Sequence, residues 1–174
     1  MCKLLLPLLL ALCTPAAYAD TFFSKNTSYN VCFTPGQDCT SLIIKSIVQA
    51  KQSIYVQAYS FTSAVIAQAL VEAKRRGVDV EVILDKSQSK TNKYTSATFF
   101  INNSIPTWID YRPAIAHNKV MIIDNKTVIT GSFNFTKAAQ FKNAENLIII
   151  NDTELAHTYL RNWNARQAMS KLPI

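Results

Sequence analysis

The chain has 174 residues, of which 49% are apolar and 17% charged, and this composition excludes a disordered or acidic solvating chain. Its three glycines exclude collagen and the multi-glycine nucleotide-binding loops, and two histidines with four cysteines leave little material for a metal site. The formal net charge of +7 indicates a polyanionic partner without identifying it.

The first nineteen residues have the pattern of a secretory signal peptide. Lys3 precedes an apolar run over residues 4–12, and Ala17-Tyr18-Ala19 supplies the cleavage site. A membrane anchor is the alternative, but the run is shorter than the roughly 20 residues that span a bilayer. We expect residues 1–19 to be removed and residues 20–174 to form one exported domain, periplasmic or secreted, whose net charge falls to +6 with the loss of Lys3.

Export makes a disulfide the expected state of the two cysteines that remain, Cys32 and Cys39. An even pair of cysteines in an oxidising compartment is typical of a disulfide, which here closes a short loop. Two free buried thiols are the alternative. A metal pair is disfavoured because no third or fourth ligand lies nearby in the sequence.

Predicted strands and helices alternate along the mature chain. The first half of the chain is expected to form a strand at 29–33, a helix at 41–51 capped by Asp38 or Thr40, a strand at 54–60, a helix that is capped by Ser63 and ends at 75–77, and a strand at 78–84. A polar loop at 85–93 follows, then a helix at 94–103, a strand at 105–111 and a hairpin of 120–123 and 128–130. The chain is expected to end with a short helix after Asn134, a strand at 147–150 and a last helix that runs from the capping box at 151–154 towards Met169. This alternation predicts a single-domain α/β fold, with a mixed, largely buried sheet flanked by helices on both faces.

Four polar side chains late in the sequence could act on a phosphate ester. Residues two apart on a strand share a face, so His117 is expected beside Lys119, and Ser132 beside Asn134. If the two strands are neighbours, Lys and Asn can hold the non-bridging oxygens while the imidazole attacks phosphorus or moves a proton. Gly131 would let the backbone pass close to the bound anion.

These side chains belong to a longer pattern, H-x-K-x4-D-x6-G-S-x-N, and the sequence fits it at every specified position: His117, Lys119, Asp124, Gly131, Ser132 and Asn134. The pattern resembles the HKD motif of the phospholipase D superfamily. Residues 58–62, 77–80 and 131–136 extend the similarity to the small, exported, single-motif bacterial endonucleases of that superfamily, over nearly the whole mature chain.

The resemblance implies a phospholipase D-like fold and a phosphodiesterase that needs no metal ion or other cofactor. It implies that His117 is the nucleophile and forms a covalent phosphohistidine. Lys119, Asn134 and Ser132 would bind the phosphate, and Ser132 would also hold the geometry of the motif. Glu145 would accept a hydrogen bond from the imidazole and support its positive charge.

Three residues have plainer interpretations. Asp124, implied to hold the geometry of the motif, could equally be a turn former, and the two roles are compatible. Glu145 alone could be a solvated charge, and only its spacing from the motif favours a catalytic role. His157 lies on the polar side of the last helix, outside any motif, and we expect it to be an ordinary surface residue.

One motif supplies half of a two-step site, because transfer through a phosphohistidine needs a nucleophile and an acid. Superfamily members with two motifs take one histidine from each. This chain has a single motif, so we expect a homodimer with one composite site on its two-fold axis, where His117 of each subunit faces the other.

Nucleic acid is the expected substrate, with phospholipid as the alternative. A charge of +6 per mature chain suits a phosphate backbone, and Lys86, Lys90 and Lys93 in the loop after a strand are candidate phosphate contacts, unless that loop is simply solvated. A basic surface also suits anionic headgroups, and residues 21–23 could touch a membrane. A catalytically inactive DNA- or membrane-binding module is a third possibility, which the complete motif disfavours.

Overall fold

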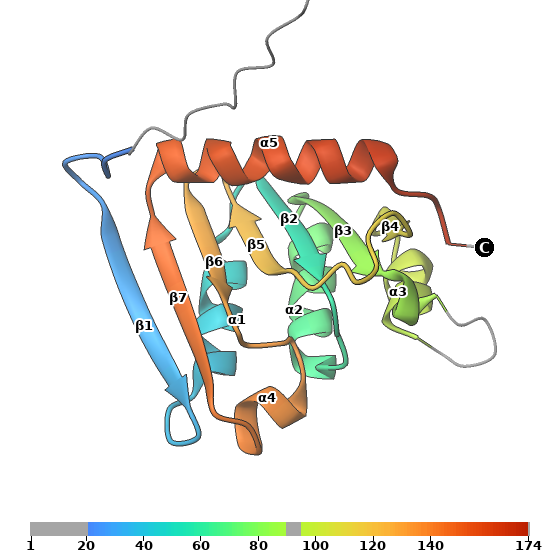
Figure 1. Cartoon of the computed structure of the whole chain (residues 1–174), viewed down its shortest axis with the longest axis horizontal. Coiled ribbons are helices and arrows are strands. Elements are labelled where there is room, and N and C mark those ends of the chain that lie inside the picture. The colour runs from blue at the N-terminus through green and yellow to red at the C-terminus, as the bar shows by residue number, and fades with distance from the viewer. Residues whose placement is uncertain (1–20, 90–94, 174) are drawn as a thin grey trace, which may run out of the picture.

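The computed structural model describes residues 21–89 and 95–173, which form one mixed α/β domain around a seven-stranded sheet (Figure 1). The predicted signal peptide, residues 1–19, lies outside the described residues. In chain order the elements are β1 (Ser28–Thr34), α1 (Cys39–Gln49), β2 (Ser53–Ala58), α2 (Ala64–Arg75), β3 (Asp79–Asp85), the 3-10 turn η1 (Lys86–Gln88), α3 (Ser96–Asn102), β4 (Thr107–Asp110), β5 (Lys119–Ile123), β6 (Thr127–Gly131), α4 (Lys137–Phe141), β7 (Glu145–Asn151) and α5 (Thr153–Met169).

The sequence predicted the type and order of these elements, with differences at their ends. Asp38 and Asp152 cap α1 and α5, each accepting a backbone N–H three residues on, as expected for short acidic side chains at an N-cap. Ser63 precedes α2, but its side chain makes no capping hydrogen bond. The loop expected from Asp85 starts one residue later, because Asp85 ends β3 and η1 follows it.

Helices cover both faces of the sheet (Figure 1). On one face, Ile43 and Ile47 of α1 and Leu70 of α2 pack in one cluster with inward residues of the strands. On the other face, Ala156 and Trp163 of α5 pack on a second, smaller cluster. The predicted layer fold, with a largely buried sheet between helices, is therefore confirmed. Among the described residues, no helix is both long and apolar enough to cross a bilayer.

The sheet order is β1-β7-β6-β5-β2-β3-β4, and strand direction decides what meets at each edge. β2, β3 and β4 run parallel, whereas β5 is antiparallel to β2, and β6, β7 and β1 continue the alternation. The carboxyl ends of β2, β3 and β6 therefore meet the amino ends of β5 and β7. We call this line of strand ends the site edge.

The predicted disulfide is present. The sulfur atoms of Cys32, on β1, and Cys39, at the start of α1, are bonded, with their Cα atoms 5.6 Å apart and both side chains buried. The bond ties the edge strand β1 to the helix layer.

Reducing this disulfide is expected to lower the free energy of unfolding by about 2.5 kcal/mol, because the unfolded chain regains the loop entropy that the bond removes. Urea denaturation with and without a phosphine reductant measures the difference. A Cys32→Ala, Cys39→Ala double variant should not respond to the reductant. An unchanged unfolding midpoint for the reduced wild type would contradict a stabilising bond.

Candidate active site at one sheet edge

The site edge collects His117, Lys119 and Ser132 of the motif together with Glu145, whereas Asp124 of the motif lies at the other edge of the sheet. His117 lies in the segment between β4 and β5, Lys119 begins β5, Ser132 follows β6, and Glu145 begins β7. β5 pairs with β6 and β6 with β7, so the two strands of the motif are neighbours, as the proposed chemistry requires.

His117 is exposed, and Tyr59 fixes its surroundings. The ring centroids of the two side chains lie 4.6 Å apart at an interplanar angle of 53°. The backbone N–H of Tyr59 also donates a hydrogen bond of 2.8 Å to the carbonyl of Asn118. Tyr59 therefore contacts both the imidazole and the main chain beside it.

Lys119 places a buried cation beside the imidazole. Its side chain is 7% exposed, and Nζ donates a 2.8 Å hydrogen bond to the carbonyl of His117 and lies 5.3 Å from the centroid of the Tyr59 ring. Burial lowers the pKa of the Lys119 ammonium, and the negative charge of Glu145 only partly opposes this shift. An anion bound here would gain a strong interaction, because the cation is already removed from water.

Glu145 is held by hydrogen bonds other than the one that the resemblance implies. Its Oε2 accepts from the Ser132 hydroxyl at 2.5 Å and its Oε1 from Nδ2 of Asn143 at 2.9 Å. Among the described residues its hydrogen bonds go to these two donors and not to His117. The reason is strand order, since β6 lies between β7 and β5 and the Ser132 hydroxyl is the first donor that the carboxylate meets.

Gly131 allows a close approach of its backbone to the neighbouring strand β7. Its φ is +143°, and a Cβ there would lie 2.3 Å from the carbonyl oxygen of Asn146. The same oxygen accepts the N–H groups of Ser132 and Phe133 at 3.1 and 3.2 Å. The neighbouring strand β7 therefore fills the space that a Cβ would need, and closeness of Gly131 to a bound anion stays a prediction.

Asn134 lies two residues after Ser132, and its side-chain amide has an acceptor, the buried Oδ1, without a hydrogen-bond partner among the described residues. A side-chain amide in this state can turn to bind an incoming group. This is consistent with the phosphate-binding role that the resemblance implies.

Asp124 lies at the opposite end of β5 from His117. Its carboxylate accepts the backbone N–H groups of Lys51, Gln52 and Ser53 at 2.7–3.2 Å, and its φ of +52° begins the β5–β6 turn. The two interpretations are compatible in the structure, since the backbone of Asp124 begins the turn and its carboxylate ties that turn to the start of β2. It fixes the pairing of β5 with β2 and touches no other residue of the site.

The predicted lysine cluster is only partly described. Lys86 is exposed, and its Nζ donates to the carbonyl of Pro113 at 3.2 Å, in the segment that leads to His117. Lys90 and Lys93 lie outside the described residues. Within residues 21–89 and 95–173, no three or more His, Cys, Asp or Glu side chains are grouped so that they could hold a metal ion.

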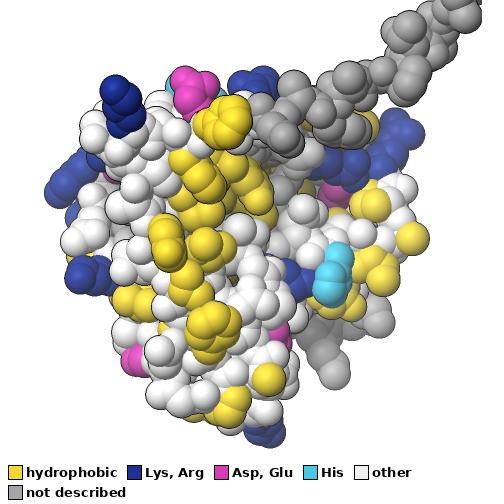
Figure 2. Space-filling model, turned by 60° about the vertical axis from the view of Figure 1, so that its left-hand side comes forward, with side chains coloured by type: hydrophobic (Ala, Val, Ile, Leu, Met, Phe, Trp, Pro, Cys, Tyr) yellow, Lys and Arg dark blue, Asp and Glu magenta, His cyan; other side chains and the backbone are white. Residues whose placement is uncertain are grey.

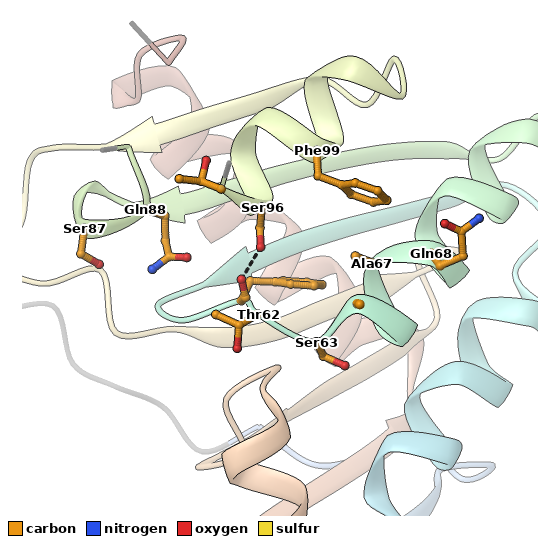
Figure 3. Close-up of a pocket in the computed structure, with 11 residues that line it drawn as sticks. Thr62, Ser63, Ala67, Gln68, Ser87, Gln88, Ser96 and Phe99 are labelled. Atoms are coloured by element: carbon orange, nitrogen blue, oxygen red, sulfur yellow. Dashed lines mark hydrogen bonds between the residues drawn. The ribbon is translucent and has the colours of Figure 1, made fainter. Parts of the chain in front are cut away.

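A cavity of about 570 Å³ lies between α2 and α3 (Figure 3). Its walls include Phe61 and Phe99 together with hydroxyl and amide side chains. The hydroxyl of Ser96, labelled in Figure 3, donates a hydrogen bond to the carbonyl of Phe61. Among the residues that the structure describes, those that line the cavity are uncharged, and none of the predicted site residues described here is among them.

The sequence alone did not single out Tyr59 or Asn146 as site residues. Tyr59 had a signal, because it directly follows a strand whose carboxyl end meets the site edge. The sequence carried no such signal for Asn146, because this residue acts mainly through its backbone carbonyl, which accepts the N–H groups of Ser132 and Phe133.

A family model described as "Cardiolipin synthase, PLD-like domain" matches residues 43–166, more than half of the chain. The chain belongs to the phospholipase D superfamily. It is 51% identical over 139 residues to a phospholipase D of Rickettsia felis, covering 80% of this chain and 69% of that protein. Two solved structures are similar: Nuc, a phospholipase D family member of Salmonella typhimurium (41% identity, TM-score 0.78, 83% of this chain and 97% of that one), and NucT of Helicobacter pylori (25%, 0.77, 83% and 98%). The predicted family and fold are confirmed, and the protein is a hydrolase of this superfamily.

Replacing Gly131 by Ala is expected to lower the free energy of unfolding by about 2–4 kcal/mol, because the new Cβ collides with the backbone of β7. Gly77→Ala is the matched control. Gly77 also has a positive φ, +89°, but no atom lies within 4 Å of the added methyl, so the loss there should be about 1 kcal/mol. Equal losses in urea denaturation would contradict a tight contact at Gly131.

Proposed function

We propose that the protein is an exported phosphodiesterase that cleaves nucleic acid without sequence preference, using His117 as its nucleophile. The observation that carries the proposal is the pairing of an exposed imidazole with a buried ammonium. His117 and Lys119 are joined by the Nζ-to-carbonyl hydrogen bond of 2.8 Å. This gives one group that can attack phosphorus and one that can hold the charged oxygens around it.

The reaction has two transfers. An imidazole nitrogen of His117 attacks phosphorus, the bond from phosphorus to the leaving oxygen breaks, and that oxygen takes a proton from a second imidazole to leave as an alcohol. Water then attacks phosphorus, gives a proton back to the second imidazole, and the phosphorus–nitrogen bond breaks. The Lys119 ammonium and the Asn134 amide stabilise the negative charge on the non-bridging oxygens, and no metal or other cofactor takes part.

The second imidazole comes from another copy of the chain. The sequence has only two histidines, and the other one, His157, lies exposed on α5, which starts at the edge of the sheet opposite the site edge. A homodimer whose two-fold axis passes through the site edge would bring the His117 side chains of both subunits to one phosphate.

An exposed apolar band supports this dimer. Tyr29, Val31 and Phe33 alternate along β1 on one face of the sheet and are 68%, 41% and 56% exposed. Figure 2 shows hydrophobic side chains gathered in a band on this side of the molecule. Phe33 of β1 is the strand partner of Asn146 of β7, and the backbone N–H of Asn146 donates a hydrogen bond to the Ser132 hydroxyl. The apolar band therefore reaches the site edge. A contiguous apolar surface of this kind is typical of a protein interface.

The substrate class follows from charge. The mature chain carries +6, so a dimer presents +12 to a phosphate backbone, and Lys86 stands beside the segment that leads to His117. Phospholipid is the second candidate, because the relative from Rickettsia felis is named phospholipase D. Both substrates present a phosphodiester to the same nucleophile.

Replacing His117 by Ala should lower phosphodiesterase activity by on the order of 1,000-fold or more, because the nucleophile is lost. Plasmid DNA, RNA and phosphatidylcholine are offered side by side in excess chelator, with His157→Ala as the matched control that retains activity. Choline release without DNA or RNA cleavage would reject the nuclease in favour of the phospholipase. Complete loss of wild-type activity in chelator would contradict the metal-free mechanism.

Mixing experiments test the composite site. If dimers re-form at random from equal amounts of wild type and His117→Ala, activity should fall to about a quarter of the all-wild-type value, since each site needs both histidines. Independent sites would retain about half. The dimer would also be overturned if light scattering showed the wild type to be strictly monomeric while the assay showed full activity.

A further inference from the structure

The segment that carries His117 has no regular structure of its own. Residues 111–118 leave β4 and must pass the ends of β3 and β2 to reach β5, because the strand order is β5-β2-β3-β4. No strand pairing fixes this segment. The position of His117 therefore depends on individual contacts to it.

One of these contacts comes from a buried carboxylate outside the motif. Asp85 is the last residue of β3, the strand whose end is passed by residues 111–118, and it is only 3% exposed. Its Oδ2 accepts the N–H of Ala116 at 2.7 Å, and its Oδ1 accepts the N–H of Ser87 at 2.8 Å. Each oxygen has its own donor, so the carboxylate is fixed in one orientation against the residue that precedes His117.

The charge on this carboxylate is maintained. Burial raises the pKa of Asp85, but the hydrogen bonds from Ser87 and Ala116 and the nearby Lys86 ammonium outweigh it and hold the pKa below its ordinary value. Lys86 also donates to the carbonyl of Pro113 in the same segment. Asp85 and Lys86, neighbours in sequence, thus hold the segment at two points.

The residue after His117 is held as well. The carbonyl of Asn118 accepts the N–H of Tyr59 at 2.8 Å. His117 consequently stands between two residues whose backbones are tied, one to β3 through Asp85 and one to the end of β2 through Tyr59.

We propose that Asp85 is a positioning residue that sets the place of His117 for attack on phosphorus. The proposal rests on the proposed role of His117 as the nucleophile. Asp85 does not touch the reacting atoms; it acts through Ala116. Two acceptor oxygens are needed, which an aspartate supplies and an asparagine does not.

Asp85→Asn tests this with little change in size. One of the two N–H groups loses its acceptor, and the segment shifts. We expect kcat to fall by on the order of 10- to 100-fold, since misplacement of a reacting group by about 1 Å has effects of this size. KM should change less than about threefold, because Lys119 and Asn134 still bind the phosphate.

Asp152→Asn is the matched control. Asp152 is also buried and its carboxylate also accepts a backbone N–H, that of Leu155 at 2.9 Å, but it lies at the edge of the sheet opposite the site edge. Its replacement should weaken the cap of α5 and leave kcat unchanged.

Proton NMR of the imidazole rings supplies a readout that does not depend on turnover. With two histidines in the chain, His157 serves as the internal reference. Asp85→Asn should move the ring signals of His117 and leave those of His157 in place. The proposal is overturned if the His117 signals or kcat of Asp85→Asn match those of Asp152→Asn. A wild type inactive on every phosphodiester would contradict the proposed function alone, and the ring signals would still decide whether Asp85 positions His117.

Discussion

The antiparallel pairing of β5 with β2 is the constraint on which the site depends. β2, β3 and β4 run parallel, and a parallel β5 would have carried Lys119 to the far edge of the sheet. Because β5 runs the other way, Lys119 stands opposite Ala58 at the carboxyl end of β2. Asp124 secures this arrangement from the other end of β5, where its carboxylate holds three consecutive N–H groups before and at the start of β2. An acidic residue of the motif thus serves the site from the length of a strand away.

The hydrogen bonds at the site edge leave the imidazole of His117, the proposed nucleophile, exposed. Ser132, Asn143, Glu145 and Asn146 bond one another, and Lys119 and Asp85 bond the backbone on either side of the imidazole. Each of these groups is committed to a neighbour, whereas the ring of His117 contacts only Tyr59 among the ring pairs of the described residues. The site is therefore preorganised around one exposed group, and in the proposed dimer the acid that a single chain lacks would be the same group of a second copy.

The sequence predicted the elements well because their signals are local. The runs at 54–60 and 78–84 and the turn at Asp124 depend on neighbouring residues, and the fixed spacing of the motif gave the residues of the site. What could not be predicted depends on strand order. The bond of Glu145 to Ser132, the approach of Gly131 to Asn146 and the contact of Asp85 with Ala116 join residues that are distant in the chain or lie on different strands. No spacing rule reports such contacts.

The central claim is that His117 becomes covalently bonded to phosphorus during turnover. Acid-sensitive phosphohistidine is preserved by quenching the reaction in alkali within the first turnover and digesting the protein for mass spectrometry. The account predicts a phosphorus adduct on the peptide that contains His117, still esterified to the part of the substrate that has not left, and none on the His117→Ala protein. Rapid hydrolysis with no adduct at any time, or an adduct on another residue, would contradict it.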